Sequence, residues 1–313
     1  MKKRTLGIGI TAAVIVVGGF ATAGTMYYIN KNNSVPSMTM NHQATSGPYI
    51  VNLMSGTSYQ SGQPTSLRFT VNQNSKPFKN FADDNTKLMH LIVVRKDRTY
   101  FQHVHPDYDS ASGTFTMNHF TFPTDGQYRV FANFAPVSAA KDSMGMVETE
   151  APYVDVSVGD TSKVTSTPLG TDSLTSSAGG MVASLASAPG GDSPVTVTQP
   201  TYYAGVDGQV TVQLTKDNAL VKDLQLYLGS LGHMVILGPD LEFIHAHPMN
   251  NDISSQTGYI PFMVTFPKSG QYKIYLQTQA GGAVSTFDFN VTVKDMAKSD
   301  SSHSMDNMPG MSQ

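Results

Sequence analysis

The chain has 313 residues, of which 40% are apolar and 14% are charged, and its formal net charge is −3. This length has room for one large or two medium domains, and the low charge gives no sign of a nucleic-acid partner. The absence of cysteine excludes disulfides and thiolate metal sites. Any metal site would therefore have to use His, Met and carboxylate ligands.

The N-terminal segment, residues 1–30, predicts a membrane anchor. Basic residues at 2–4 precede an uncharged run at 5–29, which is long enough to cross a bilayer as a helix. The charge asymmetry places the N-terminus in the cytoplasm and the body of the protein outside it. A signal peptide cleaved at the sequence ATA, residues 21–23, is the alternative, and the protein would then be secreted. Both interpretations export the body.

The next segments predict a tether and a first domain. Residues 31–45 are polar and lack periodicity, which is typical of a tether. Over residues 46–158, short apolar runs rich in β-branched and aromatic residues alternate with Gly, Pro, Asn and Asp. This spacing predicts an all-β sandwich.

A second copy of the same pattern occupies residues 195–295. The sequence TFPTDGQYRVF (121–131) recurs as TFPKSGQYKIY (265–275), which indicates an internal duplication. The Ser/Thr/Gly-rich stretch 159–194 predicts a linker, although GGMVASLAS within it could pair as a strand and move the boundary. The Met- and His-rich tail, 296–313, has too little apolar content to fold alone, so we expect disorder there.

Each copy also contains a His, an apolar run, a turn and then His-x-His-Pro. These stretches are MHLIVVRKDRTYFQHVHP (89–106) and GHMVILGPDLEFIHAHP (232–248). Alternate side chains of a strand share one face, so the two histidines of each His-x-His project together. The proline after them lacks an N–H and would end the strand pairing there.

The turn decides which residue faces the first histidine of each hairpin. A two-residue loop at Lys96-Asp97 would place His90 directly opposite His103. A three-residue loop at 238–240 would likewise place His233 opposite His245.

Directly opposed Cβ atoms lie about 4.5–5.5 Å apart and diagonal neighbours about 7–8 Å apart, a span that three imidazoles can close around one ion. The sequence therefore predicts two three-histidine metal sites, made of His90, His103 and His105 and of His233, His245 and His247.

A fourth ligand is suggested at His119 in the first copy and at the aligned Met263 in the second. The alternating pattern puts Phe120 and Phe122 on the core face, so these two side chains point away from that core. Copper accepts both imidazole and thioether, whereas zinc rarely takes Met. The pair therefore favours copper, as Cu(I) or Cu(II).

Methionine is abundant, with 17 residues, and several cluster where there is little core to fill. Such soft ligands favour Cu(I) and could catch copper and pass it on, to the triads or to a copper-handling partner protein. The clusters comprise Met38, Met40 and His42, then Met144 and Met146, and finally His303, Met305, Met308 and Met311.

Other interpretations remain open at this point. Buried, mutually hydrogen-bonded histidines would be structural, and the protein would then be an exported interaction or adhesion module. A zinc or nickel binder is a third candidate. No G-x-S-x-G elbow or Gly-rich phosphate loop is present, so we do not expect an enzyme, although a three-His metal centre can activate water.

The two histidine hairpins, each followed by the TFP…GQY segment, resemble the YtkA-like and related extracytoplasmic β-sandwich proteins of bacteria. The resemblance covers most of residues 49–293 and reaches the six hairpin histidines only. It implies an immunoglobulin-like or cupredoxin-like sandwich and a metal-linked role, associated with copper, outside the cytoplasm. Blue-copper electron transfer is not implied, because such a site needs a thiolate.

Overall fold

A computed structural model describes residues 48–140, 147–165, 167–186, 200–249, 251 and 258–296. All of them belong to one compact unit of the chain, 38–313. In this described part the chain is all-β, as predicted, apart from a single 3-10 turn, η1 (Thr161–Lys163). The predicted anchor, the tether and the tail beyond residue 296 lie outside it. Among the described residues, no helix has the length and apolarity needed to cross a membrane.

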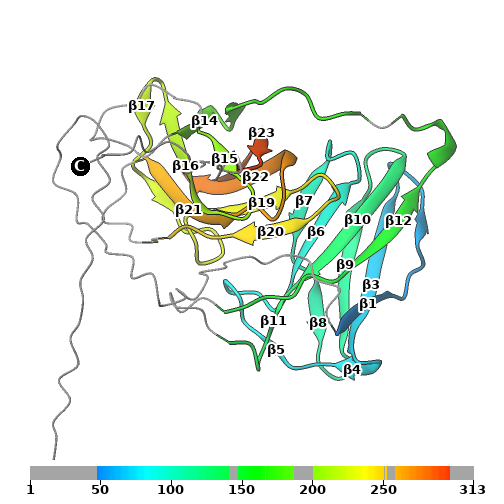
Figure 1. The fold of residues 1–313 in the computed structure, drawn as a ribbon. Coiled ribbons are helices and arrows are strands. Elements are labelled where there is room, and N and C mark those ends of the chain that lie inside the picture. Colours follow the sequence, from blue (N-terminus) through cyan, green and yellow to red (C-terminus); the bar gives the residue numbers. More distant parts are fainter. Residues whose placement is uncertain are drawn as a thin grey trace, which may run out of the picture. The chain divides into compact units, whose positions relative to one another are not determined.

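The first half of the chain folds into a β-sandwich, called sandwich 1, whose strands run from blue to green in Figure 1. One sheet has the order β1-β3-β9-β8, with β4 beside β3; the other has the order β2-β12-β10-β6-β7. A small third sheet pairs β11 with β5. The strands are β1 (Tyr49–Leu53), β2 (Ser58–Tyr59), β3 (Pro64–Gln73), β4 (Lys76–Phe78), β5 (Phe81–Ala82), β6 (His90–Arg95), β7 (Phe101–Val104), β8 (Asp107–Asp109), β9 (Thr114–Thr121), β10 (Gly126–Asn133), β11 (Ala135–Pro136) and β12 (Tyr153–Val158).

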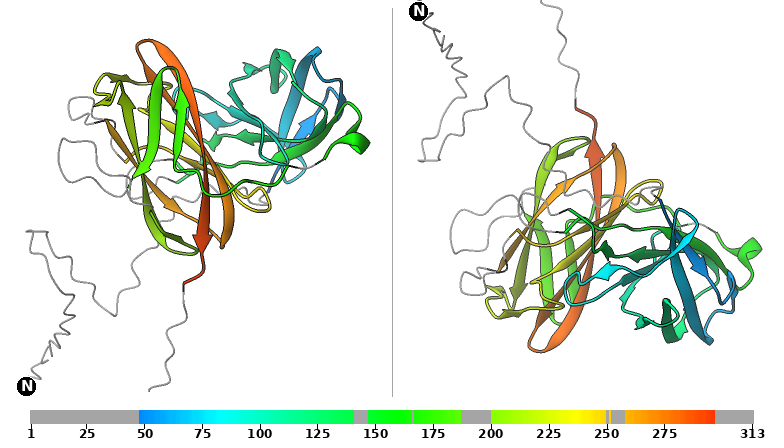
Figure 2. Two further views of the ribbon diagram at one scale, coloured as in Figure 1. Left: turned by 90° about the horizontal axis from the view of Figure 1, so that it is seen from above. Right: turned by 90° about the horizontal axis from the view of Figure 1, so that it is seen from below.

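The second half repeats this plan as sandwich 2. One sheet has the order β13-β14-β16-β17, with β21 beside β16; the other has the order β15-β23-β22-β19-β20, with β18 beside β22. Figure 2 shows the two sheets of this sandwich from two further directions. The strands are β13 (Thr175–Ala178), β14 (Met181–Ala186), β15 (Tyr202–Tyr203), β16 (Asp207–Lys216), β17 (Ala219–Leu220), β18 (Leu224–Gln225), β19 (His233–Leu237), β20 (Phe243–Ala246), β21 (Tyr259–Thr265), β22 (Gly270–Ala280) and β23 (Ala283–Lys294).

The alternative for the predicted linker is confirmed: the stretch GGMVASLAS contains a paired strand, and residues 175–186 are not a linker. Strands β13 and β14 form a hairpin there, and β14 pairs with β16 as β1 pairs with β3 in sandwich 1. Met181, Ala183 and Leu185 enter the core of sandwich 2. The small side chains that suggested a linker are therefore part of a strand buried on one face.

The repeated TFP…GQY segment has a structural explanation in both sandwiches. Tyr128 and Tyr272 are fully buried, and each hydroxyl donates a hydrogen bond of 2.8 Å to the backbone carbonyl four residues upstream. This contact resembles the tyrosine corner of β-sandwiches, which fixes a loop to the strand that follows it. The glycine two residues before each tyrosine has positive φ, and a Cβ there would come within 3 Å of the neighbouring hairpin.

The hairpin strands are buried on both faces. In β6, Leu91 and Val93 belong to the core of sandwich 1, whereas Ile92 and Val94 belong to a separate apolar cluster shared with sandwich 2. This shared cluster contains two stacked aromatic pairs, Phe101 with Tyr275 and Phe131 with Phe243, with ring centroids 4.4 and 4.7 Å apart. The outer faces of the two histidine-bearing sheets therefore pack against each other.

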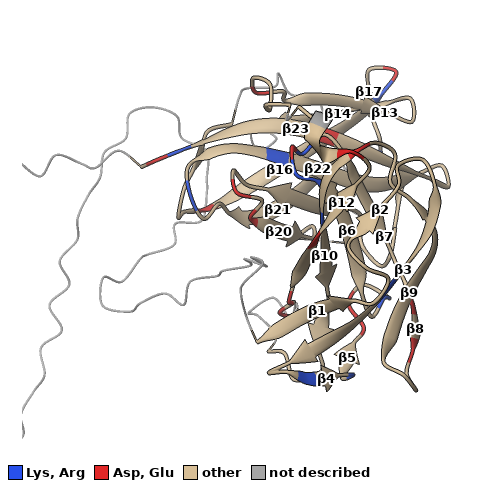
Figure 3. Ribbon diagram, turned by 90° about the vertical axis from the view of Figure 1, so that its right-hand side faces the viewer, with Lys and Arg blue, Asp and Glu red and all other residues tan. Residues whose placement is uncertain are grey.

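Polar contacts accompany this apolar packing. Figure 3 shows Lys and Arg positions and Asp and Glu positions dispersed over the described elements without gathering by sign. The polar contacts across the shared cluster are mostly hydrogen bonds: Arg98 donates to the carbonyls of Gly238 and Gln271 and accepts one from the Tyr275 hydroxyl through its own carbonyl.

Candidate metal centre

The histidine hairpins form, but in a different register from the predicted one. In sandwich 1, His103 lies opposite Ile92, and continuing this register brings His90 opposite His105. The predicted two-residue loop is wrong because the turn extends over 96–99. There, the Asp97 carboxylate accepts hydrogen bonds from the backbone N–H and hydroxyl of Thr99, and Arg98 takes positive φ.

The second hairpin is shifted in the same way. His245 pairs with Val235, and Gly238 donates its N–H to the carbonyl of Glu242. The loop is therefore 239–241 instead of the predicted 238–240, and Leu241 takes positive φ. In both hairpins the shift amounts to two residues, so every side chain keeps its predicted face because strand faces alternate with a period of two.

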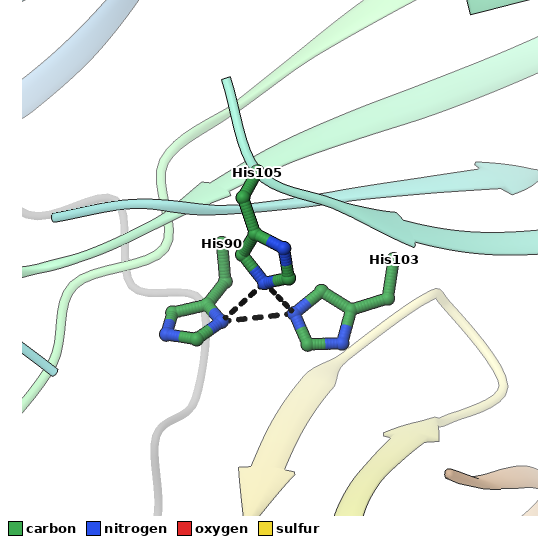
Figure 4. Close-up of side chains that lie close together, drawn as sticks. All are labelled: His90, His103 and His105. Atoms are coloured by element: carbon green, nitrogen blue, oxygen red, sulfur yellow. Dashed lines mark hydrogen bonds between the residues drawn. The ribbon is translucent and has the colours of Figure 1, made fainter. Parts of the chain in front are cut away.

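The structure brings the six predicted histidines together in two groups. Triad 1 is His90, His103 and His105, and triad 2 is His233, His245 and His247; in each group one ring nitrogen per residue lies within 4.8 Å of the other two. In triad 1 the three nitrogens converge, as Figure 4 shows, at 2.9 Å (His90 Nδ1 to His103 Nε2), 3.2 Å (His105 Nε2 to His90 Nδ1) and 3.1 Å (His105 Nε2 to His103 Nε2). Three ligands at about 2 Å from one ion, with tetrahedral angles, would be separated by roughly 3.3 Å.

Triad 2 is similar but not identical, because the Asn85 amide nitrogen lies 3.1 Å from His247 Nε2. His233 Nδ1 lies 3.1 Å from His247 Nε2. His245 Nε2 is fully buried and has no hydrogen-bond partner. A buried nitrogen without a hydrogen bond is costly, so the arrangement calls for a ligand at this atom.

In four of the six rings, the nitrogen that does not face the triad donates a hydrogen bond to an acceptor outside it. His90 Nε2 donates to the carbonyl of Asp84 at 2.9 Å, and His233 Nε2 donates to the carbonyl of Tyr227 at 2.8 Å. These carbonyls lie in matched turns, bridged between Asp84 and Lys87 and between Tyr227 and Ser230. Because a neutral imidazole has one proton, His90 Nδ1 and His233 Nδ1 are left as bare lone pairs.

Two amide side chains accept the corresponding hydrogen bond from the first histidine of each His-x-His. His103 Nδ1 donates to Gln277 Oε1 at 2.8 Å, and His245 Nδ1 donates to Asn133 Oδ1 at 2.7 Å. Each amide is oriented by its own N–H bonds, from Gln277 to the Thr286 hydroxyl and from Asn133 to the carbonyl of Glu150. The Nε2 atoms of His103 and His245 are therefore also bare lone pairs.

Burial keeps these imidazoles neutral. It lowers the pKa of His90, and it lowers the pKa values of His103 and His245 well below the ordinary value, with the neighbouring histidines adding to the effect on these two. It also lowers the pKa of His105 to about 3 and that of His233 to about 4. Neutral imidazole is the form that binds a metal ion.

The two triads lie close to each other. Ring centroids from different triads are 5.5 Å apart for His90 and His245, and 5.7 Å apart for His103 and His233. All six rings thus lie in one buried cluster where the two sandwiches meet. The sequence predicts the two groups but not their proximity.

The structure does not group His119 with the histidines of triad 1, and it places Met263 directly after Phe262, which bridges Pro248, next to His247 of triad 2. Both predicted fourth ligands point away from the core, as expected, but they belong to β9 and β21, in the sheet of each sandwich that does not carry the histidine hairpin. His119 is exposed, at a register shift in the pairing of β3 with β9. In sandwich 2, the bridge between Pro248 and Phe262 puts the backbone at Met263 beside triad 2.

The predicted Met clusters at 38–42, 144–146 and 303–311 fall outside the described residues. Sequence reasoning missed Asn133 and Gln277. A signal for them exists, because both follow the glycine of the repeated GQY segment by the same interval, in GQYRVFAN and GQYKIYLQ.

The sequence matches a domain of unknown function, DUF8832, twice, over residues 43–148 and 188–295, which together make up more than half of the chain. Each match contains one histidine hairpin, and the β13–β14 hairpin lies between them. No curated protein matches the chain.

Several solved structures of β-domains share low identity with the chain. Fibronectin(III)-like modules of Clostridium thermocellum CbhA are 12% identical over 79% of this chain and 95% of theirs, with a TM-score of 0.19. An I-band fragment of titin is 8% identical over 80% of this chain and 67% of its own, with a TM-score of 0.19. Invasin, a bacterial integrin-binding protein, is 16% identical over 80% of this chain and 39% of its own, with a TM-score of 0.19. At these TM-scores the likenesses carry no functional argument.

Proposed function

The chain belongs to the DUF8832 family, whose domain it contains twice. We propose that it binds two copper ions, one in each histidine triad. Its role would be to sequester copper or deliver it to a copper-handling partner protein. The predicted N-terminal anchor would hold it at the cell membrane with its body outside the cytoplasm.

One contact carries the proposal. His90 Nδ1 and His103 Nε2 face each other at 2.9 Å, while each ring has its proton on the other nitrogen. Two lone pairs at this distance repel unless a cation lies between them. An extra proton is disfavoured, because burial lowers the pKa of both rings. A metal ion bound by three neutral nitrogens removes the repulsion.

The surroundings favour a monovalent ion, which points to Cu(I). Both triads offer neutral donors only, and the electrostatic cost of burying an ion grows with the square of its charge. A structural zinc site in proteins has four protein ligands, whereas the described residues supply three for each ion, so zinc would need a water in the fourth position. If a divalent ion binds instead, Cu(II) stands above Zn(II) in the affinity order for nitrogen ligands.

If the histidines were instead purely structural, as in an interaction module, each buried ring nitrogen would be expected to have a hydrogen-bond partner. His245 Nε2 has none. This atom favours the metal-binding interpretation over the structural one.

The test is a titration of the whole chain with Cu(I) against a competing chelator, repeated with Cu(II) and Zn(II). We expect two Cu(I) ions per chain. His103→Ala with His105→Ala should remove one ion, and His245→Ala with His247→Ala should remove the other. His119→Ala, which changes an exposed histidine outside the triads, should leave two. Unchanged binding in both double variants would contradict the proposal.

A further inference from the structure

Two buried amides link the triads to the opposite sandwich. Asn133 ends β10 and pairs in register with His90 of its own sandwich, and Gln277 of β22 pairs with His233 of its own. Their side chains nevertheless bond to histidines of the other sandwich, Asn133 to His245 and Gln277 to His103.

Both amides are held as fixed acceptors. Asn133 is fully buried and donates its N–H groups to the Thr149 hydroxyl and the carbonyl of Glu150. Gln277 is 9% exposed and donates to the Thr286 hydroxyl. Neither amide oxygen is therefore free to turn away from the imidazole that it contacts.

We infer that each domain completes the metal site of the other: Gln277 is a positioning residue for triad 1, and Asn133 is a positioning residue for triad 2. This inference rests on the proposed function. An acceptor on the far nitrogen of a ligating imidazole fixes its tautomer and orientation and makes it a better donor, and its loss typically costs 10- to 100-fold in metal affinity. Metal binding at either triad thus depends on contact between the two domains.

The experiment uses the full chain in two backgrounds, each with one triad left. His245→Ala with His247→Ala leaves triad 1, and His103→Ala with His105→Ala leaves triad 2. We expect Gln277→Leu to weaken Cu(I) binding about 10- to 100-fold at triad 1 and to leave triad 2 nearly unchanged. Gln277→Glu, which retains an acceptor, should restore the affinity of triad 1.

A control variant and a reciprocal variant accompany this experiment. Gln279→Leu changes an exposed glutamine bond two residues further along the same strand, to Gln225, and should leave both triads unaffected. Asn133→Ala tests the reciprocal contact and should weaken triad 2 while sparing triad 1. This second variant decides the matter if Gln277→Leu does not fold.

A purely local role would give the opposite pattern, because Gln277 is the strand neighbour of His233 and Asn133 that of His90. The inference is overturned if Gln277→Leu weakens triad 2 instead of triad 1, or both equally, and the copper proposal then stands. If neither background binds copper, the proposed function fails, and the inference fails with it.

Discussion

Asp84 makes the two triads chemically unequal. Its carbonyl accepts the hydrogen bond from His90, and its carboxylate Oδ2 is buried without a hydrogen-bond partner, 3.9 Å from His90 Nε2. The matched position in sandwich 2 is Tyr227, which has no charge at neutral pH. A nearby carboxylate offsets part of the charge of a bound ion, and the benefit is greater for a divalent ion than for a monovalent one.

Removing this charge should therefore change the metal preference of triad 1. We expect Asp84→Asn to weaken Cu(II) and Zn(II) binding at triad 1 about tenfold or more, and Cu(I) binding less, because the hydrogen bond from His90 goes to the backbone and survives. Competition titrations in the background that lacks triad 2 measure this. An equal loss for all three ions would mean that Asp84 acts on the fold and not through its charge.

At the scale of elements, the sequence predicts which face the histidines share but not which residues they oppose. The face follows from alternation along β6, β7, β19 and β20, and a register shift of two residues leaves it unchanged. The register depends on the turns, where side-chain bonding by Asp97 and the positive φ of Arg98 and Leu241 override the loop lengths suggested by composition. Composition leaves β14 undecided between linker and strand, because its small residues are typical of linkers.

The β14 strand gives a test at this scale. Leu185 is fully buried in the core of sandwich 2, so we expect Leu185→Ala to lower the free energy of unfolding by about 2–5 kcal/mol. Val182 lies on the same strand and is 40% exposed, so Val182→Ala should change stability by about 0.5 kcal/mol or less. Urea unfolding measures both. Small and equal effects of both substitutions would contradict the placement of β14 in the core and support a linker at residues 175–186.

For the whole molecule, the packing of the two sandwiches explains why the histidine-bearing strands are apolar on both faces. Both faces of β6 and β19 are apolar, which alone is compatible with structural, hydrogen-bonded histidines. The second apolar face is covered by the other sandwich, and this packing brings the triads together. Neither copy contains a motif that predicts packing against the other copy. The cluster of six rings was therefore not predictable from the repeat.

Burial of the histidines predicts how the metal-free chain responds to acid. Five of them have pKa values lowered below the unfolded value of about 6.5: His90, His103, His105, His233 and His245. Below pH 6.5 the unfolded chain therefore binds more protons than the folded one, so the stability present above that pH declines as the pH falls toward 4. Each such group contributes a slope of up to about 1.4 kcal/mol per pH unit.

Urea unfolding of the metal-free chain at pH 7.5 and pH 5 measures this decline. His245→Ala removes one buried histidine and should reduce the difference. Equal stability at the two pH values would contradict the burial of these histidines in the neutral form.

X-ray absorption at the copper edge, on the full chain loaded with Cu(I), tests the central claim most directly. The proposed function predicts two copper ions per chain, each with about three nitrogen neighbours near 2 Å and the multiple-scattering signal of imidazole. A first shell dominated by sulfur would place the copper on methionines instead of the triads and would contradict the account.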